Sequence, residues 1–214
     1  MSHPNNKVSS SSVDNQEIEL IVGNSSSNFS GVTSTMLQVT SLQKHMINLR
    51  IMGKHFVPDP SMTITFWEVA KMCRRPLSNG KWRIFHARRV DEMIQGVILK
   101  YVFRAKIKLV FSSAAQRKRS ASTVWLSNKM DAVIAMSNRS AKYLNKPPAK
   151  INLHGVQIDN YTPAENKQEA WQALGYGGKY GIGILGRVRE QKGVHLFVEA
   201  CIKVLPKYPD VNAA

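Results

Sequence analysis

Two cations near the C-terminal end of the chain have a spacing that suits phosphate chemistry. Arg187 and Lys192 lie in the run 186–193, which reads Gly-Arg-Val-Arg-Glu-Gln-Lys-Gly. The run follows an apolar, strand-like segment, residues 180–185, and precedes an amphipathic helical pattern that begins at Val194. A strand end, a short loop and a helix start would place both cations beside free backbone N–H groups, which predicts a diphosphate-binding site. A solvated turn with two surface cations is the alternative interpretation.

The segment 181–186 also matches G-x-G-x-x-G, the dinucleotide-binding fingerprint. In that fingerprint the glycines form the turn after a strand, whereas the apolar residues between these glycines indicate the strand itself. No second strand ending in an acidic residue follows. We therefore do not expect NAD or FAD to bind here.

A second loop of this kind lies near the start of the chain. A short strand is predicted over residues 17–22, a Gly/Ser loop over 23–31 and a helix from 32 to 43. Ser30 or Thr33 is the expected helix cap, and Gly31 would let a phosphate or sugar approach the backbone. An ordinary capped turn between a strand and a helix is the alternative.

A third group of polar residues stands at the end of a predicted strand, residues 81–86. His86 ends this strand, and Arg88 and Arg89 follow it. Open α/β sheets bind ligands at the carboxyl ends of their strands, and paired arginines suit a phosphate or an acidic sugar. A purely structural role is the alternative for the histidine.

The elements that would position these residues alternate between strand and helix, which predicts an α/β fold with a parallel sheet. Residues 1–15 are polar and of low complexity, and we expect them to be disordered. We expect a first Rossmann-like domain over 16–156, a linker over 157–178 and the beginning of a second such domain over 179–214. Further strands are expected at 47–52, 107–111, 131–137 and 151–156, and further helices at 65–73, 90–103, 124–130 and 138–144.

The charge of the chain predicts an anionic partner. Lysine and arginine number 30 against 14 acidic residues, and most of the excess lies between residues 44 and 119. Nucleic acid, a membrane surface and a phosphorylated substrate all fit such an excess. The segment 99–111 interleaves cations with apolar residues; its first half fits a basic helix on an anionic membrane, or equally a solvated helix face.

The cysteines and the apolar runs bear on location. Cys73 and Cys201 stand alone, which fits a reducing compartment and argues against a zinc site. The N-terminus has no apolar signal region, and no run approaches the roughly 20 apolar residues of a membrane span. We therefore expect a cytoplasmic protein.

Several of these segments, in this order, resemble the retaining family 4 glycosyltransferases, which have the GT-B fold. More narrowly, they are similar to the mannosyltransferases that build the lipopolysaccharide inner core of Gram-negative bacteria. The likeness runs over residues 18–210, and several long matches in order are more specific than one motif. The segments are 30–35, 86–93, 108–117 and 186–193.

The resemblance implies transfer of mannose from GDP-mannose, with retention, to a Kdo sugar of the core lipid. It implies no cofactor and no metal. The donor diphosphate would be held by Arg187, Lys192, Gly31 and Thr33. The acceptor candidates are His86, Arg88, Arg89 and Arg117. The expected partners are thus a nucleotide-sugar, an anionic lipid-linked core oligosaccharide and the cytoplasmic face of the inner membrane, without nucleic acid.

The chain departs from the family pattern in three places. Gln157 replaces an aspartate in the linker, and Ser112-Ser113 stand where many members carry a histidine, so no catalytic residue is assigned. The chain also ends at Ala214, after the first helix of the second domain, so we expect a C-terminal truncation with little activity of its own. Another donor such as UDP-glucose, or a non-enzymatic basic module for membranes or nucleic acids, remains an alternative.

Overall fold

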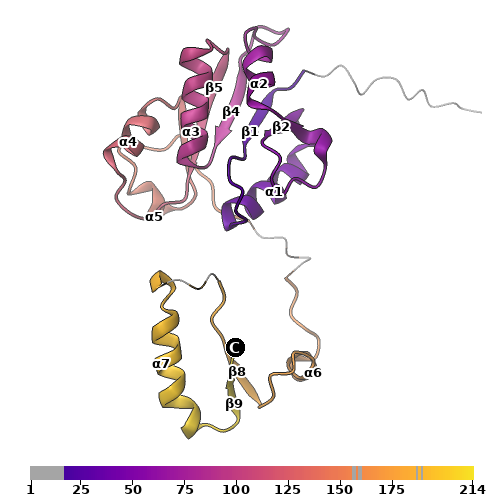
Figure 1. Cartoon of the computed structure of the whole chain (residues 1–214), viewed down its shortest axis with the longest axis vertical. Helices are drawn as coiled ribbons and strands as arrows, with labels where there is room; N and C mark the ends of the chain where they lie inside the picture. Colours follow the sequence, from indigo (N-terminus) through magenta and orange to yellow (C-terminus); the bar gives the residue numbers. More distant parts are fainter. Residues whose placement is uncertain (1–16, 156–157, 159–160, 187, 189) are drawn as a thin grey trace, which may run out of the picture. The chain divides into compact units, whose positions relative to one another are not determined.

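The computed structural model describes residues 17–155, 158, 161–186, 188 and 190–214 (Figure 1). The predicted disordered segment, residues 1–15, and Gln157 lie outside these residues. The chain divides into two compact units, Met1–Gly155 and Val156–Ala214. Among the described residues, none of the helices has both the length and the apolar character needed to cross a bilayer.

The first unit is built on a sheet of seven parallel strands in the order β3-β2-β1-β4-β5-β6-β7. The order reverses between β1 and β4, so loops from both sides meet at the carboxyl ends of these central strands. The strands are β1 (Leu20–Gly23), β2 (Leu49–Met52), β3 (Thr63–Ile64), β4 (Arg83–Ala87), β5 (Ile107–Ser113), β6 (Ala132–Ala135) and β7 (Lys150–Ile151).

Helices cover both faces of this sheet. The alternation of side chains along β1 shows how: Leu20 and Val22 pack with Met36 of α1, whereas Ile21 joins a cluster with the helices of the other face. That second, larger cluster includes Phe85 and residues of α2, α3 and α4. The helices are α1 (Gly31–Gln43), α2 (Phe66–Met72), α3 (Val90–Val97), α4 (Ala121–Asn128) and α5 (Asn138–Ala141), with a 3-10 turn η1 (Pro60–Met62) and a π-helical segment η2 (Ile98–Val102).

Capping residues mark the starts of two helices, α1 and α2. Ser30 caps α1, and its Oγ accepts a hydrogen bond from the backbone N–H of Thr33 at 3.4 Å. Thr65 and Glu68 form a capping box at the start of α2, with the Glu68 carboxylate 2.8 Å from the backbone nitrogen of Thr65. Of the two residues expected to cap the first helix, Ser30 is therefore the cap.

Among the described residues of the second unit there is one parallel strand pair, β8 (Tyr180–Ile182) with β9 (Val211–Ala213). Between them lie a 3-10 turn η4 (Glu190–Lys192), the helix α7 (Val194–Val204) and a second turn η5 (Leu205–Lys207). This is a strand–helix–strand unit with parallel strands, the arrangement typical of Rossmann-like domains.

Some predicted elements differ from the structure. Helix α6 (Lys167–Ala173), capped by Asn166, lies inside the segment predicted as a linker. The predicted helix 90–103 is α3 followed by the π-helical η2, and the predicted strand 151–156 is only the two-residue β7. The edge strand β3 and the strand β9 were not predicted, because two or three residues are too few to show an alternating pattern.

Candidate functional site

The N-terminus of α1 is open at the carboxyl edge of the sheet. A Cβ atom added to Gly31 would meet no atom within 4 Å, so the backbone there is accessible. Thr33, in contrast, is fully buried and its Oγ1 lies 3.2 Å from Ser30 Oγ. The first N–H groups of a helix have no partner inside the helix and carry positive potential, so this end can bind a negatively charged group.

Arg89 holds this helix start in place. Its Nη2 donates hydrogen bonds to Thr33 Oγ1 at 2.7 Å and to Ser30 Oγ at 3.2 Å. Its Nη1 forms an ion pair with Glu92 Oε1 at 2.9 Å. The guanidinium predicted to bind an acceptor is thus engaged within the protein, and it joins the start of α3 to the start of α1.

Glu92 is the fully buried centre of this arrangement. Its Oε2 accepts hydrogen bonds from the backbone nitrogens of Arg88 at 2.7 Å and Arg89 at 3.1 Å. Its Oε1 lies 3.5 Å from the backbone nitrogen of Ser25 in the loop before α1. A Cβ added to Gly23 would lie 2.9 Å from Glu92 Cγ, so the close approach of β1 to this carboxylate requires glycine.

His86 and Arg88 are less accessible than the sequence suggested. His86 Nε2 is hydrogen-bonded to Ser112 Oγ at 2.8 Å, and burial, with a smaller effect from Arg88, lowers the pKa of the imidazole to about 3. The histidine is therefore neutral at physiological pH. Burial also lowers the pKa of Arg88, although the charge of Glu92 opposes the shift. The Nη1 atom of Arg88 is buried and has no hydrogen-bond partner among the described residues.

The loop after β5 carries the last of the acceptor candidates. Arg117 is exposed on this loop, between β5 and α4. Two residues further on, Arg119 stacks over Phe111, with its guanidinium carbon 5.2 Å from the ring centroid, and donates a hydrogen bond to Ser113 Oγ. Arg119 is not among the predicted site residues, although it stands in the same basic loop.

The donor candidates of the second unit lie before α7. Arg187 is outside the described residues. Lys192 is exposed and ends η4, and Gly193 precedes α7 with a left-handed φ of 71°. A non-glycine residue would be strained in that conformation, so the glycine lets the chain turn directly from the lysine into the helix. The predicted donor and acceptor residues all remain predictions.

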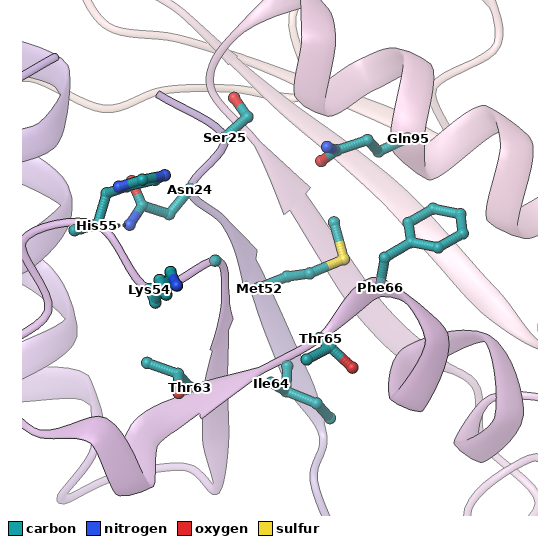
Figure 2. Close-up of a pocket in the computed structure, with 11 residues that line it drawn as sticks. Asn24, Ser25, Met52, Lys54, His55, Thr63, Ile64, Thr65, Phe66 and Gln95 are labelled. Carbon is teal, nitrogen blue, oxygen red and sulfur yellow. Dashed lines mark hydrogen bonds between the residues drawn. The ribbon is translucent and has the colours of Figure 1, made fainter. Parts of the chain in front are cut away.

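A cavity of about 390 Å³, which was not predicted, opens beside this site (Figure 2). It lies at the carboxyl ends of β1, β2 and β3, between the start of α2 and the middle of α3. Among the described residues, no three His, Cys, Asp or Glu side chains are grouped so that they could hold a metal ion.

Comparison with known proteins relates the chain to enzymes of lipopolysaccharide synthesis. No family model matches it. It is 38% identical, over 202 residues, to the lipopolysaccharide core biosynthesis mannosyltransferase LpcC of Rhizobium leguminosarum bv. viciae. It is 37% identical to LpsB of Rhizobium meliloti, which carries the same description. The matches cover 94% of this chain but 56% and 57% of the relatives, so the chain spans about half their length.

Solved structures give the same fold. The chain resembles Anabaena HepE (Alr3699), in complexes with UDP and glucose and with UDP-glucose, at a TM-score of 0.63. Sequence identity is 17%, and the likeness covers 92% of this chain and 60% of HepE. Together with the parallel sheet, this likeness confirms the predicted α/β fold of the GT-B type.

Proposed function

The chain is a homologue of the lipopolysaccharide core mannosyltransferases and has a GT-B fold, and from this premise we propose that it comprises the acceptor-side domain and the beginning of the donor-side domain of a hexosyltransferase. The complete enzyme transfers mannose from GDP-mannose, with retention, to a Kdo-containing lipid acceptor. The observation that carries the proposal is the similarity to LpcC, 38% identity over 202 residues.

The geometry of the first unit supports a site for a negatively charged donor. During transfer the bond from the sugar carbon to the diphosphate oxygen breaks while a bond to the acceptor's hydroxyl oxygen forms, the hydroxyl proton is released, and negative charge develops on the diphosphate. The open N-terminus of α1 at Gly31 offers N–H groups and a positive helix end to such charge. Arg89 and Glu92 fix that helix end before the ligand arrives, which favours electrostatic stabilisation without reorganisation.

A surface at the amino ends of β4 and β5 supports the proposal of a membrane partner. It lies at the opposite ends of the strands from the candidate site. Lys108 Nζ lies 5.0 Å from the ring centroid of Trp82, and Lys129 Nζ lies 5.4 Å from that of Trp125. Both tryptophans are exposed. We call this the basic aromatic surface; its members are Trp82, Tyr101, Lys106, Lys108, Trp125 and Lys129. The Asp131 carboxylate pairs with Lys108 at 3.5 Å and with the largely buried Lys100 at 2.6 Å, so it offsets part of this positive charge.

This composition suits the surface of an anionic membrane. Indole and phenol rings favour the lipid interface, where one end is apolar and the other is wet, and lysines are attracted to anionic headgroups. The acceptor of the proposed reaction is itself a lipid. A protein that holds the basic aromatic surface against the cytoplasmic face of the inner membrane would meet that acceptor there.

The test is a transfer assay on two forms of the protein. The 214-residue chain, and the same chain extended by the remaining part of LpcC, are each incubated with radiolabelled GDP-mannose and a Kdo-lipid acceptor. We expect the extended form to label the lipid and the shorter form to label little, because a GT-B site needs two complete domains. UDP-glucose serves as the competing donor. Absence of transfer from every nucleotide-sugar by a folded extended form would refute the proposal.

A further inference from the structure

The cavity at the carboxyl ends of β1, β2 and β3 has the size of a small-molecule site. Its volume of about 390 Å³ lies within the range of roughly 300–1,000 Å³ found for ligand pockets. Figure 2 shows the side chains of Gln95, from α3, and Met52, from the end of β2, extending into the same space. Asn24 and His55 lie on the side opposite Gln95.

Two amide groups of this cavity lack partners for their oxygens. Asn24 is fully buried and its Nδ2 donates to the backbone oxygen of His55 at 2.8 Å, which fixes the amide. The Oδ1 of Asn24 and the Oε1 of Gln95 are buried without a hydrogen-bond partner among the described residues. Such an acceptor destabilises the protein when it is left unpaired. A ligand that brings hydroxyl donors would remove that destabilisation.

The remaining lining defines the other features of the ligand. Met52, Ile64 and Phe66 offer an apolar wall, which suits the C–H face of a sugar ring. Lys54 and His55 also line the cavity, whereas no aspartate or glutamate does among its described lining residues. A hydroxyl-rich ring that carries one negative group would fit the amide oxygens, the apolar wall and the basic residues of this cavity.

We propose that this cavity binds a negatively charged sugar ring of the acceptor, with hydroxyls on Asn24 and Gln95 and the negative group at Lys54. The assignment of this ring to the acceptor rests on the proposed function; the binding of the ring does not. In this proposal the acceptor's negative charge is recognised in the cavity, whereas Arg89 keeps its structural partners Glu92, Ser30 and Thr33.

A site-resolved measurement uses the methionine of the cavity as its reporter. The 214-residue chain is labelled with ¹³C at its methionine methyl groups, and the signal of Met52 is identified by Met52→Leu. Titration with the sugar acid Kdo should shift the Met52 signal saturably, while the exposed Met46 stays unmoved. Two further sugars are titrated for comparison. Mannose 6-phosphate carries a phosphate instead of a carboxylate, and methyl mannoside carries no charge. We expect the neutral sugar to bind at least tenfold more weakly than the better of the two anions.

Two variants separate a binding role from a structural one. Lys54→Gln should weaken binding of the preferred anion about tenfold, the loss of one charge-assisted hydrogen bond, whereas Lys81→Gln, on the exposed turn before β4, should change nothing. Gln95→Leu should reduce binding by a similar factor without lowering the melting temperature, because it removes an unpaired buried oxygen. A role in holding the fold would instead lower the melting temperature.

The outcomes distinguish the cavity from the reaction. A Met52 signal that no sugar moves, or equal binding by Lys54→Gln and Lys81→Gln, overturns the proposed site. Binding in the cavity together with failure of the extended protein to transfer sugar refutes the reaction and leaves the site standing. Transfer with an acceptor KM that Lys54→Gln does not alter supports the reaction and refutes the site.

Discussion

At the scale of single residues, the ion pair between Arg89 and Glu92 decides the shape of the candidate site. Glu92 is buried without exposure, and the Arg89 side chain is 16% exposed. Breaking a buried pair leaves one charge uncompensated, so Glu92→Gln should lower the free energy of unfolding by about 3 kcal/mol. Urea unfolding followed by circular dichroism measures the change.

The neighbouring carboxylate supplies the control for this prediction. Asp91 is exposed and accepts a hydrogen bond from Ser25 Oγ, so Asp91→Asn removes the same charge from the surface of the same helix turn. We expect a loss below about 1 kcal/mol there. Equal effects of the two substitutions would contradict the central role of Glu92.

His86 gives the fold a dependence on pH. Its pKa in the folded protein is about 3, below the usual 6.5, so the unfolded chain binds a proton that the folded chain does not. Stability from this residue is therefore complete above pH 6.5 and falls as the pH drops toward 3. Between pH 7 and pH 5 the wild type should lose about 2 kcal/mol more than His86→Gln, which does not titrate. Parallel pH slopes for the two proteins would show that His86 ionises freely in the fold.

Lys192 carries the donor prediction that can be tested on the described residues. In the extended protein, Lys192→Gln should raise the KM for the nucleotide-sugar about tenfold, because a charged contact to the diphosphate is lost. Lys203→Gln, in the last turn of α7, removes the same charge from the same unit. Identical KM values for both variants would remove Lys192 from the donor site.

At the scale of elements, local signals predicted most of the first unit. The Ser30 cap, the short helix from Thr65 and the apolar runs of the central strands are all readable over short stretches. The lengths of the peripheral elements were less predictable. Glu17 and Glu19, for example, precede β1 instead of starting it, and the Glu17 carboxylate accepts a hydrogen bond from Ser78 N at 2.6 Å.

The candidate site was harder to predict than the fold, for a physical reason. The run of Arg88, Arg89 and Glu92 was visible, but only the structure shows that the glutamate is buried and uses Arg89 as its partner. Gln95 and Asn24 carry no distinctive sequence signal. Their importance depends on what surrounds them, and these neighbours come from β2, β3 and α2.

Helix α3 approaches the sheet so closely that one glycine sets the distance. A Cβ at Gly96 would lie 2.9 Å from Phe85 Cδ1 and 3.0 Å from Leu109 Cδ2, and the side chains of Phe85 and Leu109 are both buried. Gly96→Ala should therefore destabilise the protein by about 1–3 kcal/mol, although alanine favours helices. Gly31→Ala, where no atom lies within 4 Å, should leave the melting temperature unchanged or slightly higher. A stabilised Gly96→Ala would mean that the helix can move away from the strands.

At the scale of the first unit, separate groups of cations lie at the two ends of the parallel strands. Lys106 and Lys108 stand at the amino end of β5 in the basic aromatic surface, whereas Arg117 and Lys118 follow its carboxyl end. If the basic aromatic surface contacts the membrane, Lys106→Gln with Lys108→Gln should weaken binding to phosphatidylglycerol vesicles about tenfold or more, near 1 kcal/mol per charge. Cosedimentation measures this binding, and uncharged phosphatidylcholine vesicles give the background that does not depend on lipid charge.

Removing Arg117 and Lys118 together, as Arg117→Gln with Lys118→Gln, matches this change in net charge at the opposite edge. We expect this control to retain most of the vesicle binding, because its two positions lie away from the basic aromatic surface. If both pairs weaken binding equally, the attraction depends on total charge and not on an oriented surface.

The placement of β1 between β2 and β4 also constrains the order in which the nascent chain can become native. The loop after β1 reaches its final partner only when Glu92 has been synthesised, since Ser25 and Glu92 are separated by 67 positions. Until β4 has been synthesised, β1 has one open edge, and such distant contacts are slow to form. Any shorter fragment used to study this protein should therefore extend through β4, or its first strand will be free to pair with other chains, and on through α3, which brings Glu92 to the loop after β1.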